Sequence, residues 1–193
     1  MKLPPLILAS ASPRRAELLH ALGVEFQVVA SDAPEIHDEQ LTAWEMALIN
    51  ARRKACAVAK KFPDALVLSA DTLVYLDREA KLFGKPTDLA DAHRMLTELQ
   101  GKTHAVITGV CLLEQRTHKQ RMFAEWTDVS FHPLSAKQIK DYLALVNPTD
   151  KAGAYAIQEH GERIVEKISG SYSNVVGLPI ELLREEMAAW AAR

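Results

Sequence analysis

A continuous apolar run at 65–70, Ala-Leu-Val-Leu-Ser-Ala, constrains the fold more than any other feature of this chain. An uninterrupted run of this length is typical of a strand that is buried on both faces, and such strands occur in sheets that carry helices on either side. Helical and extended patterns also alternate along most of the sequence. We therefore predict the α/β class, with a mixed, twisted sheet flanked by helices.

The expected helices are marked by caps at their first residues. Ser12 and Pro13 suit the start of a helix that ends before a glycine at position 23. Thr42 and Ser135 each open a capping box, in which a Glu or Gln follows three residues later. The predicted helices occupy 13–22, 42–62, 88–99, 135–147 and 179 onward.

The expected strands are short apolar or alternating segments between these helices. They occupy 6–8, 26–30, 65–70, 103–113, 123–131 and 163–168, with 73–77 also extended. The strands at 103–113 and 123–131 are predicted to be antiparallel and joined by a polar hairpin. Loops or turns are expected at 31–40, 82–86, 150–158 and 170–174.

Composition limits the possible classes of protein. A chain of 193 residues, 48% of them hydrophobic, can bury a substantial core in one domain, which we expect to cover 1–193. The formal net charge of −2 shows no excess of basic residues of the kind that binds nucleic acid. Cys56 and Cys111 lie far apart, which disfavours a disulfide framework or a zinc site. No run approaches transmembrane length, and the segment before Ser10 is too short for a signal peptide, so we expect a cytoplasmic protein without membrane contact.

The segment Ser10-Ala11-Ser12-Pro13-Arg14-Arg15 joins the first predicted strand to the first predicted helix. A helix start directs backbone N–H groups, hydroxyls and guanidinium groups toward one point, as an anion site requires. The segment therefore suggests a phosphate site. An ordinary strand–helix turn with solvated arginines is the alternative.

Four further charged residues stand out, although each has a simpler interpretation. Asp71 follows the apolar run at 65–70, at a strand end where open α/β sheets place their ligands. There it can bind a cation or orient a water molecule. Alternatively, it could cap a turn. Lys54 lies in the middle of a predicted helix, on what could be a solvated face. Lys85 lies between a glycine and a proline in a loop. Glu35 belongs to an acidic segment that alone would be a solvated loop.

The segment 150–158 mixes small residues with an aromatic side chain and a terminal amide, and it is neither clearly helical nor clearly extended. Gln158 could recognise the polar edge of a base, and Tyr155 could pack against the pocket. The joint occurrence of this segment with the charged residues argues for a site.

These residues resemble the Maf family of nucleoside triphosphate pyrophosphatases, whose motifs occur here in family order over nearly the whole chain. The motifs that carry the resemblance are Ser10-Ala11-Ser12-Pro13-Arg14-Arg15, Lys54-Ala55, Ala70-Asp71-Thr72, Gly84-Lys85-Pro86, Asp150-Lys151-Ala152-Gly153-Ala154-Tyr155 with Gln158, and Val176-Gly177-Leu178-Pro179. The resemblance implies cleavage of a nucleoside triphosphate between the α and β phosphates, with a divalent cation. It also implies a two-lobed α/β fold with a deep nucleotide cleft, related in shape to the house-cleaning inosine triphosphatases, and a homodimer.

The sequence resembles one specificity branch of the family in particular. Thr72 after Asp71, together with Ile157-Gln158, is similar to the branch that acts on dTTP and UTP. The branch that acts on 7-methyl-GTP usually has a glutamine after the aspartate. The resemblance implies that Arg14, Thr72 and Gln158 select the base and that Asp71 accepts a proton.

The residue chemistry is consistent with this function. Hydrolysis of a triphosphate requires neutralisation of charge rather than a covalent intermediate. Carboxylate oxygens are ligands that Mg²⁺ or Mn²⁺ prefer. We expect catalytic roles for Asp71, Glu35, Lys54 and Lys85, with Glu35 and Asp71 holding the metal and Asp71 also deprotonating the attacking water. The expected substrate-binding residues are Ser10, Arg14, Arg15, Thr72 and Gln158.

Other functions stay open at this point. A nucleotide-binding regulator of cell division would need occupancy without turnover, and the same chemistry could act on 7-methyl-GTP, CTP or a modified pyrimidine nucleotide. A binder of single-stranded nucleic acid is disfavoured because basic and aromatic residues are not interleaved.

Overall fold

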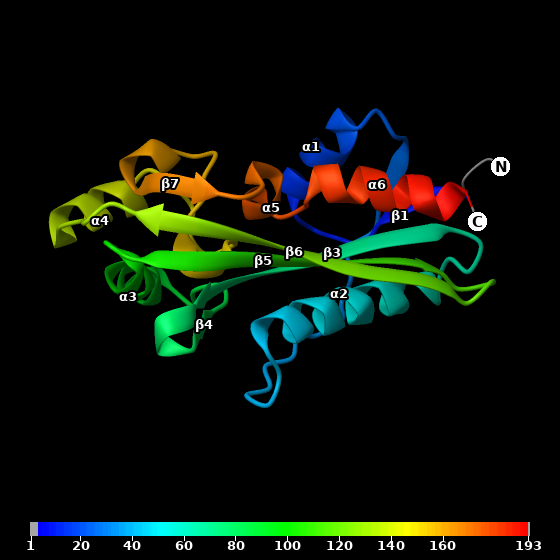
Figure 1. Ribbon diagram of the computed structural model, residues 1–193, viewed down its shortest axis with the longest axis horizontal. Helices are drawn as coiled ribbons and strands as arrows, with labels where there is room; N and C mark the ends of the chain where they lie inside the picture. Colours follow the sequence, from blue (N-terminus) through cyan, green and yellow to red (C-terminus); the bar gives the residue numbers. More distant parts are fainter. Residues whose placement is uncertain (1–3, 193) are drawn as a thin grey trace. The chain divides into compact units, whose positions relative to one another are not determined.

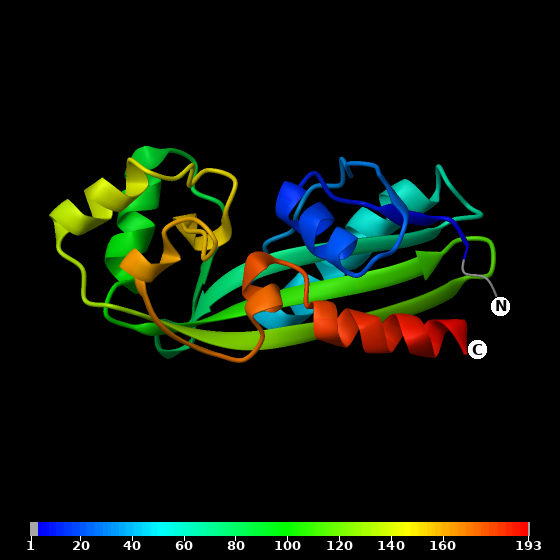
Figure 2. The ribbon, with the colours of Figure 1, turned by 90° about the horizontal axis from the view of Figure 1, so that it is seen from above.

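The computed structural model describes residues 4–192. Its helices are α1 (Pro13–Ala21), α2 (Ala43–Ala59), α3 (Leu89–Leu99), α4 (Ala136–Leu143), α5 (Tyr172–Val176) and α6 (Ile180–Ala191). Its strands are β1 (Leu6–Leu8), β2 (Phe26–Val28), β3 (Leu66–Leu76), β4 (Lys81–Phe83), β5 (Thr103–Glu114), β6 (Lys119–Phe131) and β7 (Val165–Ser169). The sheet has seven strands in the order β2-β1-β3-β5-β6-β7, with β4 paired to β3, and this confirms the predicted α/β class (Figures 1 and 2).

The chain divides into two compact units. The first comprises Met1–Asp71, Thr108–Glu125 and Gly177–Arg193, and the second comprises Thr72–Ile107 and Trp126–Val176. Strands β3, β5 and β6 each contribute residues to both units.

In the first unit, helices cover both faces of the strands (Figure 1). β1 pairs in parallel with β2 and with β3. Side chains alternate between the faces of a strand, so Leu66 and Leu68 pack with α1 and α6 whereas Val67 packs with α2. The same alternation directs Ser69 toward α2, where its hydroxyl donates a hydrogen bond of 2.5 Å to the Ala51 carbonyl.

The contact between α2 and β5 depends on Gly109. A Cβ atom at this position would lie 2.4 Å from the carbonyl carbon of Ala47 and 2.6 Å from the backbone nitrogen of Leu48. These distances are far below van der Waals contact, and both atoms belong to helix backbone that cannot rotate away. The absence of a side chain at Gly109 therefore allows α2 to lie directly against the strand.

The second unit has a core of its own between α3, α4 and the strands. Phe83, Leu96, Phe131 and Tyr142 are among its largest fully buried side chains. The loop after α4 also contributes to this core, because Tyr155 packs into it. The unit therefore holds the loop that carries Gln158 against a packed interior.

Three local predictions are wrong, and each has a physical reason. The expected loop at 82–86 begins with β4, which pairs with Val74–Leu76 of β3. The expected turn at 170–174 contains the start of α5, because the Asn174 amide donates to the Val106 carbonyl and to the Thr127 hydroxyl and so fixes a helical turn. Asp71 lies within β3 rather than at its end, because β3 continues beyond its last partner in β1 to meet β4.

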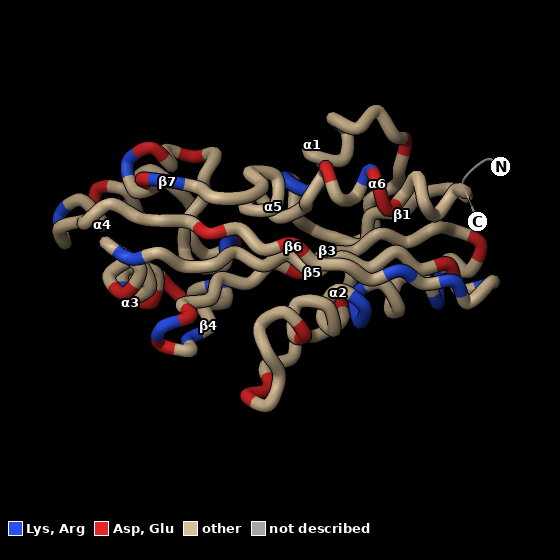
Figure 3. Tube along the Cα trace, viewed as in Figure 1, with Lys and Arg blue, Asp and Glu red and all other residues tan. Residues whose placement is uncertain are grey.

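Charged residues of both signs are interspersed along the described chain (Figure 3). No helix within 4–192 combines the length and the apolar composition that a membrane crossing requires.

Candidate active site

Three charged side chains of the first unit form a cluster. Lys54 Nζ lies 2.5 Å from Asp71 Oδ1 and 2.7 Å from Glu35 Oε1. Lys54 projects from α2, Asp71 from the face of β3 that packs on α2, and Glu35 from the loop between β2 and α2. The side chains of Asp71 and Lys54 are only 3% and 14% exposed, so solvent screens their interaction weakly.

One oxygen of this cluster has an unusual environment. Asp71 Oδ2 is buried and has no hydrogen-bond partner within the described residues. Burial raises the pKa of Asp71 above its ordinary value of 3.8, whereas the Lys54 ammonium acts in the opposite direction and the Glu35 carboxylate adds to the rise. A carboxylate in this environment is a stronger proton acceptor than one in water, and its second oxygen is available to a ligand.

The arginine at the start of α1 is held beside these carboxylates. Arg15 Nε donates to the Gly177 carbonyl at 2.7 Å, and Nη1 donates to the buried Ser10 hydroxyl at 3.3 Å. Burial lowers the pKa of the Arg15 guanidinium, while Asp71 and Glu35 act in the opposite direction. The guanidinium is thus oriented near the acidic pair, where a planar cation can meet a phosphate.

Ser12 occupies the N-cap position of α1, as predicted, but its hydroxyl accepts no capping hydrogen bond within residues 4–192. Its backbone N–H instead donates to Ser10 Oγ at 3.1 Å. The Ser10 hydroxyl therefore organises both the turn and Arg15.

The carboxylate pair fits a divalent cation of the hard, oxygen-preferring kind. Asp71 Oδ2 supplies an unpartnered buried oxygen, and Glu35 places a second carboxylate on the same lysine. Within the described residues no third His, Cys, Asp or Glu completes a metal-binding group with them. Mg²⁺ commonly binds through one or two carboxylates and takes its other oxygens from water and substrate phosphates. The residues present therefore fit such a cation.

The structure brings together part of the set predicted from sequence. Ser10, Arg15, Glu35, Lys54 and Asp71 converge in the first unit, and Arg14 lies beside Arg15 in the first turn of α1. The other predicted site residues belong to the second unit. They are the half-buried Thr72 in β3 and the exposed Lys85 and Gln158 on loops, and their roles stay predictions.

Sequence reasoning missed the residue that holds the Glu35 loop. Asn50 of α2 is 1% exposed. Its Oδ1 accepts from the Ile36 backbone N–H at 2.8 Å, and its Nδ2 donates to the Ile36 carbonyl at 3.3 Å. The available signal was a polar residue one turn before Lys54, among apolar positions such as Ala47 and Ala51. Asn50 thus fixes the backbone next to Glu35.

Replacing Asn50 with Ala should lower the free energy of unfolding by about 1–3 kcal/mol, because both backbone groups of Ile36 lose their Asn50 partner. Urea denaturation measures this change. Asn147, an exposed asparagine in a turn, is the matched control, and Asn147→Ala should cost about 0.5 kcal/mol or less. Equal losses in the two variants would contradict the role of Asn50.

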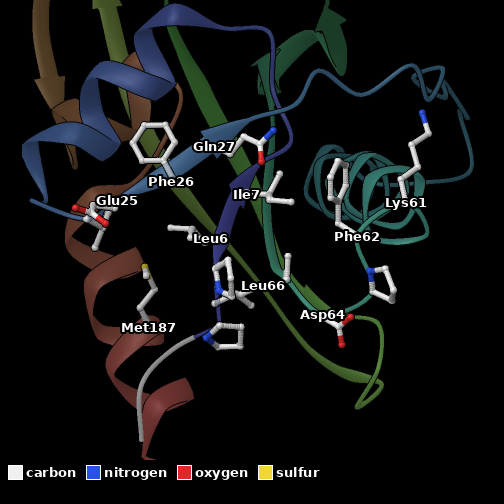
Figure 4. Close-up of a pocket in the computed structure, with 15 residues that line it drawn as sticks. Leu6, Ile7, Glu25, Phe26, Gln27, Lys61, Phe62, Asp64, Leu66 and Met187 are labelled. Atoms are coloured by element: carbon white, nitrogen blue, oxygen red, sulfur yellow. The ribbon is translucent and has the colours of Figure 1, made fainter.

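A separate pocket of about 1110 Å³ lies elsewhere in the first unit (Figure 4). Leu6, Phe26, Leu66 and Met187 are among the residues that line it. It lies where the parallel strands β1 and β3 begin, whereas Ser10 follows the end of β1. None of the clustered charged residues lines it, so it is distinct from the candidate site.

Comparison with known proteins shows the family of this chain. The sequence matches the family described as Maf-like protein over residues 5–190. It is 46% identical over 188 residues to a dTTP/UTP pyrophosphatase of Gloeobacter violaceus, covering 97% of each chain. It is 44% identical over 178 residues to a protein of the same name from Akkermansia muciniphila, covering 92% of each chain. With a match over nearly its whole length, the chain belongs to the Maf family.

Proposed function

We propose that this chain hydrolyses dTTP and UTP to the nucleoside monophosphate and pyrophosphate by attack of water on the α-phosphorus. The observation that carries the proposal is the half-buried Lys54 that bridges Asp71 and Glu35, with one oxygen of Asp71 unpartnered within residues 4–192. The relatives named dTTP/UTP pyrophosphatase, which align over nearly their full length, support this reaction and this pair of substrates.

Asp71 is proposed as the proton acceptor for the attacking water. Its raised pKa makes the carboxylate a better base than an exposed aspartate. Lys54, 2.5 Å from Oδ1, fixes the orientation of the carboxyl group. This assignment requires no covalent intermediate, which agrees with the demands of phosphoryl chemistry.

Glu35 and Asp71 are proposed to hold Mg²⁺ or Mn²⁺. A divalent cation at such a pair neutralises phosphate charge and lowers the pKa of bound water. The support lies in the oxygen ligands and in the lysine that the two carboxylates share.

The cationic side chains are proposed to hold the polyphosphate. Arg15 is oriented by the Gly177 carbonyl and the Ser10 hydroxyl, so its guanidinium is in position before substrate arrives. Lys54 and Lys85 would add point charges, and a triphosphate carries about four negative charges for them to offset.

Base selection is assigned in this proposal to Arg14, Thr72 and Gln158. The exposed Gln158 amide can both donate and accept, as the polar edge of a pyrimidine requires. The family resemblance also supports a cytoplasmic homodimer, and sedimentation analysis of the purified chain would test the dimer.

The experiment that tests the function is pyrophosphate release across a panel of canonical and modified nucleoside triphosphates, with Mg²⁺, with Mn²⁺ and with chelator. We expect metal-dependent turnover that is fastest on dTTP and UTP. Fastest turnover of 7-methyl-GTP would retain the enzyme and overturn the assignment of Thr72 and Gln158. Nucleotide binding without turnover would instead support a regulator.

Replacing Gln158 with Ala should reduce the ratio of kcat/KM for dTTP to that for dGTP by about tenfold, because the amide contacts to the pyrimidine are lost. Steady-state kinetics with both substrates measures the ratio. Gln120, an exposed glutamine of β6, provides the matched control, since Gln120→Ala should leave the ratio unchanged. An unchanged ratio in the Gln158 variant would mean that other residues recognise the base.

A further inference from the structure

A buried polar pair in the second unit has no role in the chemistry described above. His104 of β5 and Tyr155 of the loop after α4 are 2% and 6% exposed. His104 Nε2 lies 2.9 Å from the Tyr155 hydroxyl, although 51 positions separate the two residues in the sequence. The pair therefore ties the loop at 150–158 to a central strand.

Aromatic packing fixes the geometry of this hydrogen bond. The ring centroid of Phe131 lies 4.7 Å from that of His104 and 4.9 Å from that of Tyr155, with interplanar angles of 88° and 82°. The His104 and Tyr155 rings themselves meet nearly edge-on at 5.5 Å. Three rings in mutual edge-to-face contact leave little freedom for either polar side chain to rotate.

Packing alone does not explain why this pair is polar. His104 Nδ1 is buried and has no hydrogen-bond partner within the described residues. Burial lowers the pKa of His104 to about 3 and raises the pKa of Tyr155, so both groups are neutral at physiological pH. An apolar pair of the same shape would avoid the cost of an unpartnered nitrogen. The polar pair is thus better explained by the position that it imposes on Tyr155.

The loop that Tyr155 belongs to is held at several further points. Ala156 donates its backbone N–H to the Tyr142 hydroxyl at 3.1 Å, and that hydroxyl donates to the Ala156 carbonyl at 3.3 Å. Lys151 Nζ donates to the Asn147 carbonyl at 2.7 Å. Ala154 has a φ of 64°, a strained conformation that persists only when surrounding contacts enforce it. Contacts of this kind lie on both sides of the exposed Gln158, because Lys151 Nζ also lies 3.4 Å from Glu159 Oε1.

We propose that His104 is a positioning residue for base selection, which fixes Tyr155 and thereby sets where the Gln158 amide meets the base. This inference rests on the proposed function, in which Gln158 contacts the pyrimidine. Gln158 follows Tyr155 by three residues, so a shift of the tyrosine ring moves the backbone from which the amide projects. His104 itself touches neither substrate nor metal in this scheme.

The test compares three variants of the full chain. Tyr155→Phe removes only the hydroxyl, His104→Leu removes the hydrogen-bonding ring, and His104→Gln retains an amide that can bond the Tyr155 hydroxyl. We expect the first two to reduce the dTTP-to-dGTP ratio of kcat/KM by about tenfold, mainly through KM, with kcat for dTTP within about threefold. The double variant that combines Tyr155→Phe with His104→Leu should reduce this ratio by no more than either single variant, because both substitutions remove the same contact. The ratio measured for His104→Gln should be closer to that of the unsubstituted protein.

A stability control separates positioning from packing. Leu96 is fully buried in the same core, and Leu96→Ala should lower the melting temperature without changing the substrate ratio. An unchanged ratio in Tyr155→Phe and His104→Leu overturns the inference, whatever their melting temperatures. A changed ratio in these variants, together with an unchanged ratio in Gln158→Ala, also overturns the inference, because the effect would then not depend on Gln158. Failure of the unsubstituted chain to hydrolyse dTTP or UTP would instead overturn the proposed function.

Discussion

Replacing Asp71 with Asn is expected to lower kcat for dTTP by about 100-fold or more, because the variant keeps the shape of the side chain and loses the base. The asparagine oxygen can still accept from Lys54, so the local structure should persist. Nucleotide should therefore still bind. Steady-state pyrophosphate release measures kcat, and calorimetric titration with dTTP measures binding.

Asp64 provides the matched control for this substitution. It is an exposed aspartate paired with Arg116, so Asp64→Asn removes the same charge away from the cluster. Its kcat should stay within about twofold of the unsubstituted value. Near-normal turnover of Asp71→Asn would remove Asp71 from the mechanism, whereas loss of nucleotide binding would assign it to the binding of substrate and metal alone.

Replacing Gly109 with Ala is expected to lower the free energy of unfolding by about 3 kcal/mol or more, because the added Cβ meets backbone. The nearest atom, at 2.4 Å, is the carbonyl carbon of Ala47 in α2, and the helix must move as a unit to relieve the contact. Since Lys54 projects from α2, activity should fall together with stability. Urea denaturation and dTTP turnover measure the two effects.

Gly161→Ala is the control for the glycine substitution. A Cβ at Gly161 would lie 3.5 Å from its nearest neighbour, which is ordinary van der Waals contact. Its effect on stability should be about 0.5 kcal/mol or less. If Gly109→Ala were as stable as Gly161→Ala, the packing of α2 on β5 would not depend on the missing side chain.

Much of the fold could be predicted because local signals and burial agree. The capping box at Thr42 is present at the start of α2, and a second one opens with Ser135 at α4. The apolar run of β3 is buried, as its composition indicates. By contrast, α5 depends on contacts that Asn174 makes with strands distant in sequence, and no local pattern reveals such contacts.

The charged residues that cluster around Lys54 could be singled out from the sequence, whereas the groups that position them could not. Lys54 and Asp71 could be singled out as residue types, but only the folded chain shows that they lie 2.5 Å apart. Backbone groups such as the Gly177 carbonyl, which accepts from Arg15, carry no signature in a sequence. The paired hydrogen bonds of Asn50 likewise depend on a loop whose course is set by tertiary structure.

The division into two units has a consequence for how this protein can diversify. Each unit is assembled from separate stretches of the chain, and the boundary falls between Asp71 and Thr72, which share a peptide bond. No single recombination breakpoint in the gene can therefore exchange one unit and leave the other intact. Asp71, the proposed proton acceptor, and Thr72, a proposed selectivity residue, are therefore inherited together. New substrate preferences in such a lineage are thus expected to arise by point substitution rather than by domain shuffling.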